Sequence, residues 1–216
     1  MIGVYTFAFQ YIMPTGIPGF VFYLMLGILA WTFFVNSLMM ATGAIVDNAG
    51  LLKSVFFPRA ILPVATVLFN FAQYLLTVLV FLPVMMALYG VRPALPMLAY
   101  PIFLALQLLF TAGLALLLAT WTAFFRDVRH FLEILLAMLF WMTPIVYRSA
   151  QVPARFHPLV QLSPMTPFIT AYHDIFFDGR WPALSVWVLT MAYAIGAAVA
   201  GLAVMLKHED SFSEAL

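Results

Sequence analysis

The sequence predicts an all-α, polytopic membrane protein whose helices form a bundle inside a bilayer. Hydrophobic residues make up 66% of the chain and charged residues only 8%. A soluble domain has about 45–50% apolar residues and about 25% charged residues. Long stretches carry no charge at all, and they do not alternate in polarity as the strands of a membrane barrel do. This small number of charged side chains cannot cover a water-facing surface. We therefore expect the helices to be surrounded by lipid.

Five stretches are long enough to be complete membrane spans. A helix rises about 1.5 Å per residue, so about 20 apolar residues cross a hydrocarbon core of about 30 Å. The first two predicted spans contain no charged residue, and the fourth is the shortest. The five predicted spans are residues 19–46, 63–89, 95–125, 131–147 and 182–206.

The first residues of the chain predict a partial span. Residues 1–13 are apolar but too short to cross a membrane, and the Pro- and Gly-rich stretch 14–19 then turns the chain. A signal peptide would begin with a basic region, which this stretch lacks. We interpret residues 1–13 as the second half of a spanning helix whose first half is missing, because of either a late start codon or truncation.

Basic residues predict the orientation in the membrane. Alternating connections place five basic residues on one side and four on the other, and the five lie closer to the spans. The positive-inside rule then puts the loop 47–62 and the tail 207–216 in the cytoplasm, and the segment 148–181 outside. The inner group is Lys53, Arg59, Arg126, Arg129 and Lys207, and the outer group is Arg92, Arg148, Arg155 and Arg180.

The outer segment 148–181 is too apolar for a simple loop. Residues 168–177 predict a short helix, and a second is expected between Pro153 and Gln161. Ten to thirteen helical residues reach about 15–20 Å, roughly half a membrane. We expect two interfacial or re-entrant helices, which form either an outer gate or a rigid plug. The candidate gate residues are Pro164, Pro167, Phe168 and Tyr172.

The spans contain almost no chemistry-bearing side chains. Glu133 is the one ionisable residue near the inside of a span, whereas ion-coupled carriers keep such residues at mid-membrane depth. The sequence has no phosphate-binding P-loop, no histidine spacing that suits a metal, and no cysteine. The run Tyr172-His173-Asp174 lacks a nucleophile, so we interpret it as a polar cluster at the membrane surface. We therefore predict no catalytic residue and no metal, and a net charge of +1 gives no argument for nucleic acid.

The loop 47–62 predicts a short amphipathic helix. Asp47 or Asn48 can cap it and Pro58 ends it. A helix of about ten residues is marginal alone in water, so its apolar face needs a cover. Either it lies on lipid or it docks a cytoplasmic partner. The docking interpretation uses Leu51, Leu52, Lys53, Val55, Phe56, Phe57 and Arg59.

Three stretches together resemble a known family. They are residues 48–63 with Phe57-Pro58-Arg59, residues 125–147 with Trp141-Met142-Thr143-Pro144, and residues 163–179 with Ser163-Pro164-Met165-Thr166-Pro167. In order and spacing they resemble the membrane subunit of ABC-2 type exporters, above all the permeases for O-antigen, teichoic acid and other polysaccharides. The resemblance covers essentially the whole chain. The family's amphipathic N-terminal helix and first half-span are the parts that this sequence lacks.

The resemblance implies a function and a set of partners. It implies six spans per subunit, a homodimer, and a separate cytoplasmic ABC ATPase that holds ATP and Mg, with no cofactor in this chain. The chain is then a non-enzymatic permease subunit in the bacterial cytoplasmic (inner) membrane, moving a glycan on a lipid carrier. Sugars stack on aromatic faces, although aromatic residues at 17% of the chain mostly serve packing. The candidate path residues are Trp31, Phe34, Tyr74, Phe140, Trp141 and Tyr147.

Two alternative functions remain open at this stage. The first is an ABC-2 exporter of a drug or a lipid, which a narrow apolar cleft would favour over a wide aromatic tunnel. The second is a membrane scaffold without transport, which substrate-stimulated ATP turnover would reject. An intramembrane enzyme is disfavoured because the spans offer no acid–base pair.

Overall fold

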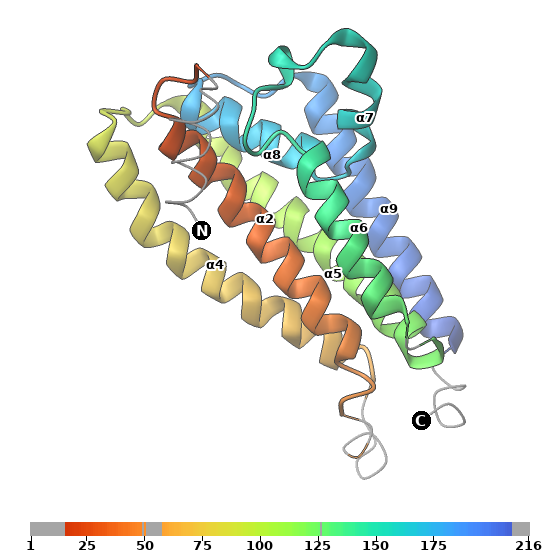
Figure 1. Cartoon of the computed structure of the whole chain (residues 1–216). Coiled ribbons are helices and arrows are strands. Elements are labelled where there is room, and N and C mark those ends of the chain that lie inside the picture. The colour runs from red at the N-terminus through yellow and green to blue at the C-terminus, as the bar shows by residue number, and fades with distance from the viewer. Residues whose placement is uncertain (1–15, 49, 51–57, 126, 209–216) are drawn as a thin grey trace.

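The computed structural model describes residues 16–48, 50, 58–125 and 127–208, and every regular element within them is helical (Figure 1). Four helices are long and apolar enough to cross a membrane, which confirms the polytopic all-α class. They are α2 (Phe20–Gly43), α4 (Ile61–Leu88), α5 (Tyr100–Phe124) with the preceding 3-10 turn η2 (Leu95–Ala99), and α9 (Leu184–His208).

The predicted span 131–147 is shorter than expected. Its helix, α6, is Val128–Met142, and its 15 residues reach about 22 Å. Thr143 is extended, with φ −85° and ψ 134°, because the residue before a proline disfavours helical backbone, and Pro144 follows. α6 runs from the end of the bundle where α5 stops to the outer segment (Figure 1). Four of the five predicted spans therefore correspond to helices of sufficient length and apolarity, and the fifth stays a prediction.

The outer segment contains the two short helices that the sequence predicts. The first is α7 (His157–Leu162), which follows two short turns, η3 (Ser149–Gln151) and η4 (Ala154–Phe156). The second is α8 (Thr166–Tyr172), which continues into a π-helical turn, η5 (His173–Phe177). Whether these helices enter the bilayer stays a prediction. The partial first span, the centre of the loop 47–62 and the tail from residue 209 lie outside the described residues.

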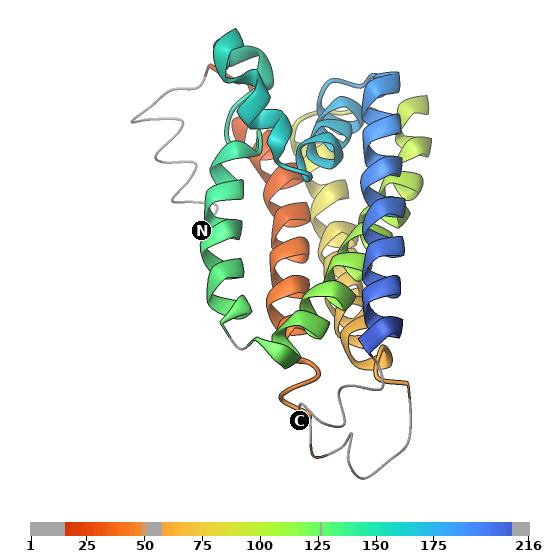
Figure 2. The same ribbon diagram turned by 90° about the vertical axis from the view of Figure 1, so that its right-hand side faces the viewer.

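Helices α5 and α9 pack closely along their length (Figure 2). A Cβ atom added to Gly201 would overlap the carbonyl oxygen of Gly113, and one added to Gly113 would overlap the backbone of Ala197. Small residues let two membrane helices approach until their backbones touch. This pair is therefore a close-packed wall of the bundle.

Helix α2 lies at the centre of the bundle, against α4, α5 and α6. Stacked rings join it to α5 and to the outer segment: Phe34 lies 5.6 Å from Phe110, and Phe110 lies 5.4 Å from Phe168. The buried amide of Gln107 makes the same connection, because its Nε2 donates to the carbonyl oxygen of Ala30 at 3.0 Å and its Oε1 accepts from the hydroxyl of Tyr172 in α8. α2, α5 and α8 are thus joined by two sets of contacts.

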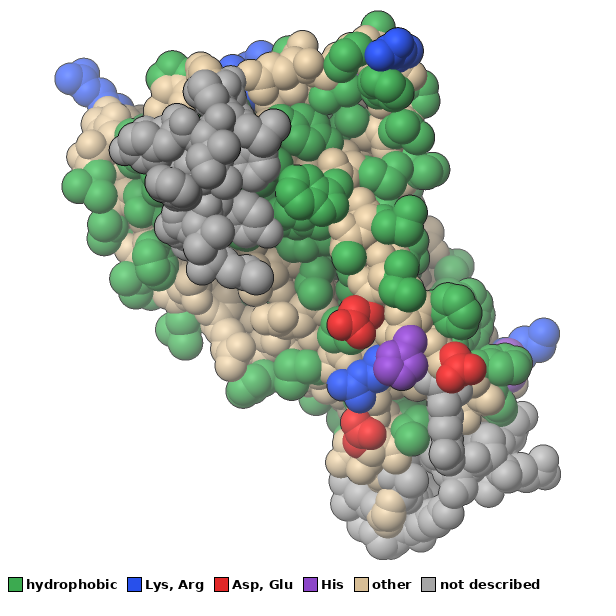
Figure 3. Space-filling view, in the orientation of Figure 1, with side chains coloured by type: hydrophobic (Ala, Val, Ile, Leu, Met, Phe, Trp, Pro, Cys, Tyr) green, Lys and Arg blue, Asp and Glu red, His purple; other side chains and the backbone are tan. Residues whose placement is uncertain are grey.

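Charged side chains gather at the two ends of the bundle. In Figure 3 they occupy both ends of one face, with mainly hydrophobic side chains between them. Because the helices alternate in direction, Arg59, Arg129 and Lys207 share one end. Arg92 and the basic residues of the outer segment share the opposite end. This is the grouping that alternating connections predict.

Candidate functional site: a groove between α2 and α6

A groove of about 520 Å³ separates α2 from α6. Its residues recur at three- and four-residue spacing, because that spacing places side chains on one face of a helix. α2 contributes Ile28, Trp31, Thr32, Val35, Asn36 and Met39, and α6 contributes Glu133, Leu136, Ala137, Phe140 and Trp141.

The groove is aromatic towards the outer segment. The rings of Trp31 and Phe140 meet edge to face at 5.8 Å, and those of Phe140 and Trp141 at 5.4 Å. Trp141 is 58% exposed, so its ring surface is open to a ligand. It also lines a second hollow of about 360 Å³ with Tyr147 and Phe156. The two hollows therefore share Trp141 and form one surface along α6.

The other half of the groove is polar. Thr32, Asn36 and Glu133 all expose their side chains there. The Thr32 hydroxyl donates to the carbonyl oxygen of Ile28 at 2.7 Å. Among the described residues, neither Asn36 nor Glu133 has a side-chain hydrogen bond or ion pair. Polar groups that face hydrocarbon without a partner are costly, so the groove is a place for water or a polar cargo.

Two of the predicted path residues lie away from this groove. Phe34 is 1% exposed and stacks on Phe110. Tyr74 is also buried, and its hydroxyl lies 3.3 Å from that of Tyr100. Trp31, Phe140 and Trp141 do come together, with Tyr147 beside them. The sequence prediction missed Thr32 and Asn36, although two polar residues four positions apart in an apolar run were a usable signal.

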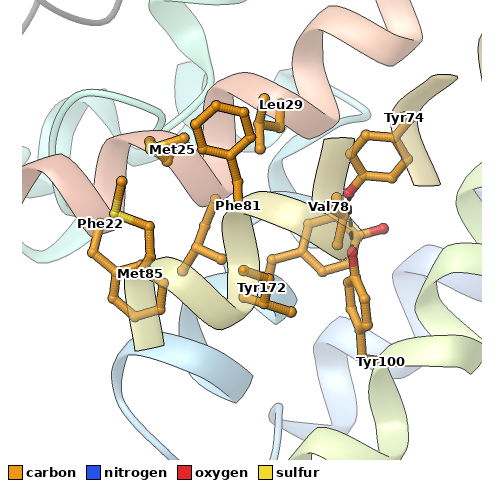
Figure 4. A pocket seen from close by; sticks show the side chains of 11 residues that line it. Phe22, Met25, Leu29, Tyr74, Val78, Phe81, Met85, Tyr100 and Tyr172 are labelled. Carbon is orange, nitrogen blue, oxygen red and sulfur yellow. Dashed lines mark hydrogen bonds between the residues drawn. The ribbon is translucent and has the colours of Figure 1, made fainter. Parts of the chain in front are cut away.

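Three tyrosines line a different and much smaller pocket (Figure 4). Tyr74, Tyr100 and Tyr172 point their hydroxyls towards one another, and apolar side chains of α2 and α4 fill the remainder. The enclosed space is about 20 Å³, which is about the room that one water molecule needs. This pocket is a packing feature, because no cargo fits it.

The predicted gate residues lie in the buried half of the outer segment. Phe168 and Tyr172 are 0% and 1% exposed, and the Tyr172 hydroxyl donates to Gln107 Oε1 at 2.5 Å. Pro167 is buried as well, and Pro164 is half-buried. The other half, around α7, is open: Phe156, Leu159 and Leu162 are 42%, 50% and 66% exposed. The structure therefore divides the segment into a buried half and an exposed half.

A cluster of polar side chains joins the beginning of the outer segment to its end. Arg148, where the segment begins, pairs with Asp178 at 3.2 Å, and Arg180 pairs with Asp174 at 2.6 Å. The ring of His173 stacks on Tyr23 at 3.6 Å, and its Nε2 donates to the Tyr23 carbonyl oxygen at 3.0 Å. The ionic groups are paired with one another, so this cluster has a structural role.

Burial sets the charge states in this cluster. Burial lowers the pKa of His173 to about 3, so the ring is neutral at physiological pH. Burial also raises the pKa of Asp174, while the hydrogen bond and charge of Arg180 oppose that rise. The hydrogen bonds that Arg180 donates to Asp174 in turn raise the pKa of Arg180.

Most of the predicted ATPase-docking residues lie outside the described residues. These are Leu51, Leu52, Lys53, Val55, Phe56 and Phe57. Arg59 is described, and it is half-buried just before α4. The docking helix therefore stays a prediction.

Comparison with known proteins identifies the family. No family model matches the chain. The chain is 29% identical to the O-antigen export system permease protein RfbA of Klebsiella pneumoniae over 219 residues, covering 99% of this chain and 82% of the relative. It is 30% identical to the protein of the same name from Myxococcus xanthus over 218 residues, with the same coverage. Together with the four apolar helices and the resemblance of its motifs, these matches show that the chain belongs to the O-antigen export permeases, a family of ABC-2 type polysaccharide export permeases.

Proposed function

We propose that this chain is the membrane-spanning subunit of an ATP-driven ABC exporter that moves a lipid-linked, O-antigen-like polysaccharide across the bacterial cytoplasmic membrane. The glycan passes along the groove between α2 and α6. One observation carries this proposal: the groove combines open aromatic surface with exposed polar side chains that have no partner among the described residues.

This combination suits a sugar better than a drug or a lipid. Sugar rings stack their apolar faces on aromatic rings, and the 58% exposed ring of Trp141 offers such a face. Sugar hydroxyls also need hydrogen-bond partners, and the groups of Asn36 and Glu133 are available for them. An acyl chain would leave both polar groups unsatisfied inside the membrane.

The energy for export enters from outside this chain. Among the described residues, the four long spans contain no acidic residue, so we assign no ion-driven step to them. A cytoplasmic ABC ATPase supplies the work, and the loop 47–62 transmits it. A second copy of the chain closes the open side of the groove, which gives a homodimer with a continuous path. The end of the bundle that carries Arg59, Arg129 and Lys207 faces the cytoplasm, and so does the C-terminus.

The exposed half of the outer segment acts as the gate in this proposal. α8 and η5 are buried against the bundle, so they stay in place. α7 and its flanking turns cover the second hollow beside Trp141, and they move to release the glycan. The gate thus involves residues 149–162 more than the four residues that the sequence predicted.

Blocking the groove tests the proposed path. Ala137 is exposed and lines the groove, so Ala137→Trp is expected to abolish export by filling it. Ala192→Trp adds the same side chain on the exposed face of α9 and is the matched control. The measurement is the surface glycan of cells that depend on this chain, at equal amounts of protein in the membrane. Full export with Ala137→Trp, or equal loss in both variants, would refute the path.

A separate substitution tests the coupling loop. Phe56→Asp places a charge on the predicted apolar face, so it is expected to abolish association with the ATPase. Co-purification of the ATPase with the permease measures this, and Ala192→Trp again serves as the control. Normal co-purification of the ATPase with Phe56→Asp would remove the docking role.

A further inference from the structure

We infer that Glu133 makes the α2–α6 groove selective for uncharged glycan repeats and against acidic ones. This inference rests on the proposed export function, and it names the substrate class that the same groove accepts.

Glu133 is the one charged side chain among the described residues that line the groove. It is exposed, and it lies less than two helical turns after the start of α6. Glu133 takes no part in the ion pairs that Arg148 and Arg180 form with Asp174 and Asp178. Within the described part of the chain, the carboxylate of Glu133 therefore faces the groove without a bonded counter-charge.

Other charged groups lie near this end of the groove, and they do not line it. Asp127, Arg129 and His130 precede Glu133 on α6, and Asp47 follows α2. Arg129 lies one turn before Glu133, yet the two side chains form no ion pair. In Figure 3, acidic, basic and histidine side chains gather at this end of the molecule. The groove itself thus presents a negative charge, and described side chains of both signs lie beside it.

A single fixed charge in such a groove discriminates by sign. Pores with acidic linings favour cations, and pores with basic linings favour anions. Repulsion between like charges grows as water is displaced and the effective dielectric constant falls. An acidic polymer carries a charge past Glu133 with every repeat, whereas a neutral polymer carries none. Neutral sugars are attracted to Glu133 instead, because their hydroxyls donate hydrogen bonds to a carboxylate.

The test compares two glycans in cells that contain the full permease with its ATPase. One glycan is a neutral polymer of hexose units, and the other carries a uronic acid in each repeat, both on the same lipid carrier. Surface glycan is measured at equal permease amounts for the native chain and for Glu133→Gln, Glu133→Asp and Asp127→Asn. Glu133→Gln removes the charge at nearly constant shape, Glu133→Asp keeps it, and Asp127→Asn removes a nearby charge that does not line the groove.

Glu133→Gln is expected to raise the ratio of acidic to neutral export roughly tenfold, which is the size of a like-charge repulsion across a partly desolvated groove. Glu133→Asp and Asp127→Asn are expected to keep the native ratio. An unchanged ratio in Glu133→Gln, or an equal rise in Asp127→Asn, would overturn the role of Glu133 while export of the neutral glycan still supports the proposed function. A native chain that exports neither glycan would instead overturn the proposed function, and the selectivity with it.

Discussion

Two helix pairs in this bundle are built in opposite ways. α5 and α9 touch through Gly113 and Gly201, where the space for even one added carbon is already occupied by backbone. α2 and α6 contact each other and also leave a groove of about 520 Å³ between them. The first pair has no room for a substrate, and the second has room and suitable side chains. The comparison indicates which interface serves stability and which serves transport.

The close-packed side extends into the outer segment. α8 is joined to α5 and α2 through the rings of Phe168, Phe110 and Phe34 and through the hydrogen bonds of Gln107. Between α6 and α2, the ring contact is the edge-to-face pair of Phe140 and Trp31. A change in groove width is therefore expected from a movement of α6 against a rigid unit of α2, α5, α8 and α9. The next four predictions test this contrast on one scale, the stability of the purified protein to heat.

The largest loss of stability is expected from Gly201→Leu. Its side chain would overlap the backbone of α5, so the two helices must separate, at a cost of about 4 kcal/mol or more. Gly196→Leu is the control, because an added Cβ there meets nothing within 4 Å. Thermal unfolding in detergent measures both variants, and equal behaviour would contradict the backbone contact.

A smaller loss is expected from Gln107→Leu. This change removes the amide that accepts from Tyr172 and donates to Ala30, and a lost buried hydrogen-bond partner costs about 1–3 kcal/mol. Tyr172→Phe and the double variant complete a thermodynamic cycle. Strict additivity of the two changes would show that the contact does not couple α8 to the bundle.

Between pH 6.5 and about pH 5, a pH-dependent loss of similar or smaller size is expected from His173. Its folded pKa of about 3 lies below the ordinary value of 6.5, so the unfolded chain binds a proton more readily. Its contribution to stability is therefore complete above about pH 6.5 and falls as the pH drops towards 3, by at most about 1.4 kcal/mol per pH unit. His173→Gln is expected to flatten this part of the stability curve. An identical curve in the variant would exclude His173 as the source.

The smallest change in stability is expected from Trp141→Ala. The ring is 58% exposed and contributes little packing, so the loss is expected to stay near 0.5 kcal/mol, as for surface substitutions. Export of the glycan is expected to fall clearly, because the open aromatic face is lost. Trp181→Ala, a similarly exposed residue before α9, is the control for losing an indole. Unchanged export with Trp141→Ala would separate this ring from the path.

The sequence alone determined the environment, the class and the family of this protein. Apolar runs of hydrocarbon length identify spans without any tertiary information, and basic residues divide between the two ends of the bundle by their order along the chain. The predicted fourth span ran to residue 147, whereas α6 ends at Met142, just before Pro144. The motifs in the loops and in the outer segment were sufficient for the family, which the relatives support.

The tertiary structure decided which residues face the groove and which are packed. Spanning helices are hydrophobic on all sides, so their pattern does not show which face meets protein and which meets lipid. Phe34 and Trp31 are equally aromatic in sequence, yet one stacks inside the bundle and the other borders the groove. Tyr172 is held by Gln107, a partner 65 residues away. Which residues are buried therefore depends on contacts between helices that are distant in sequence. In a soluble protein, the difference between polar and apolar positions indicates burial, but in a membrane helix both faces are apolar.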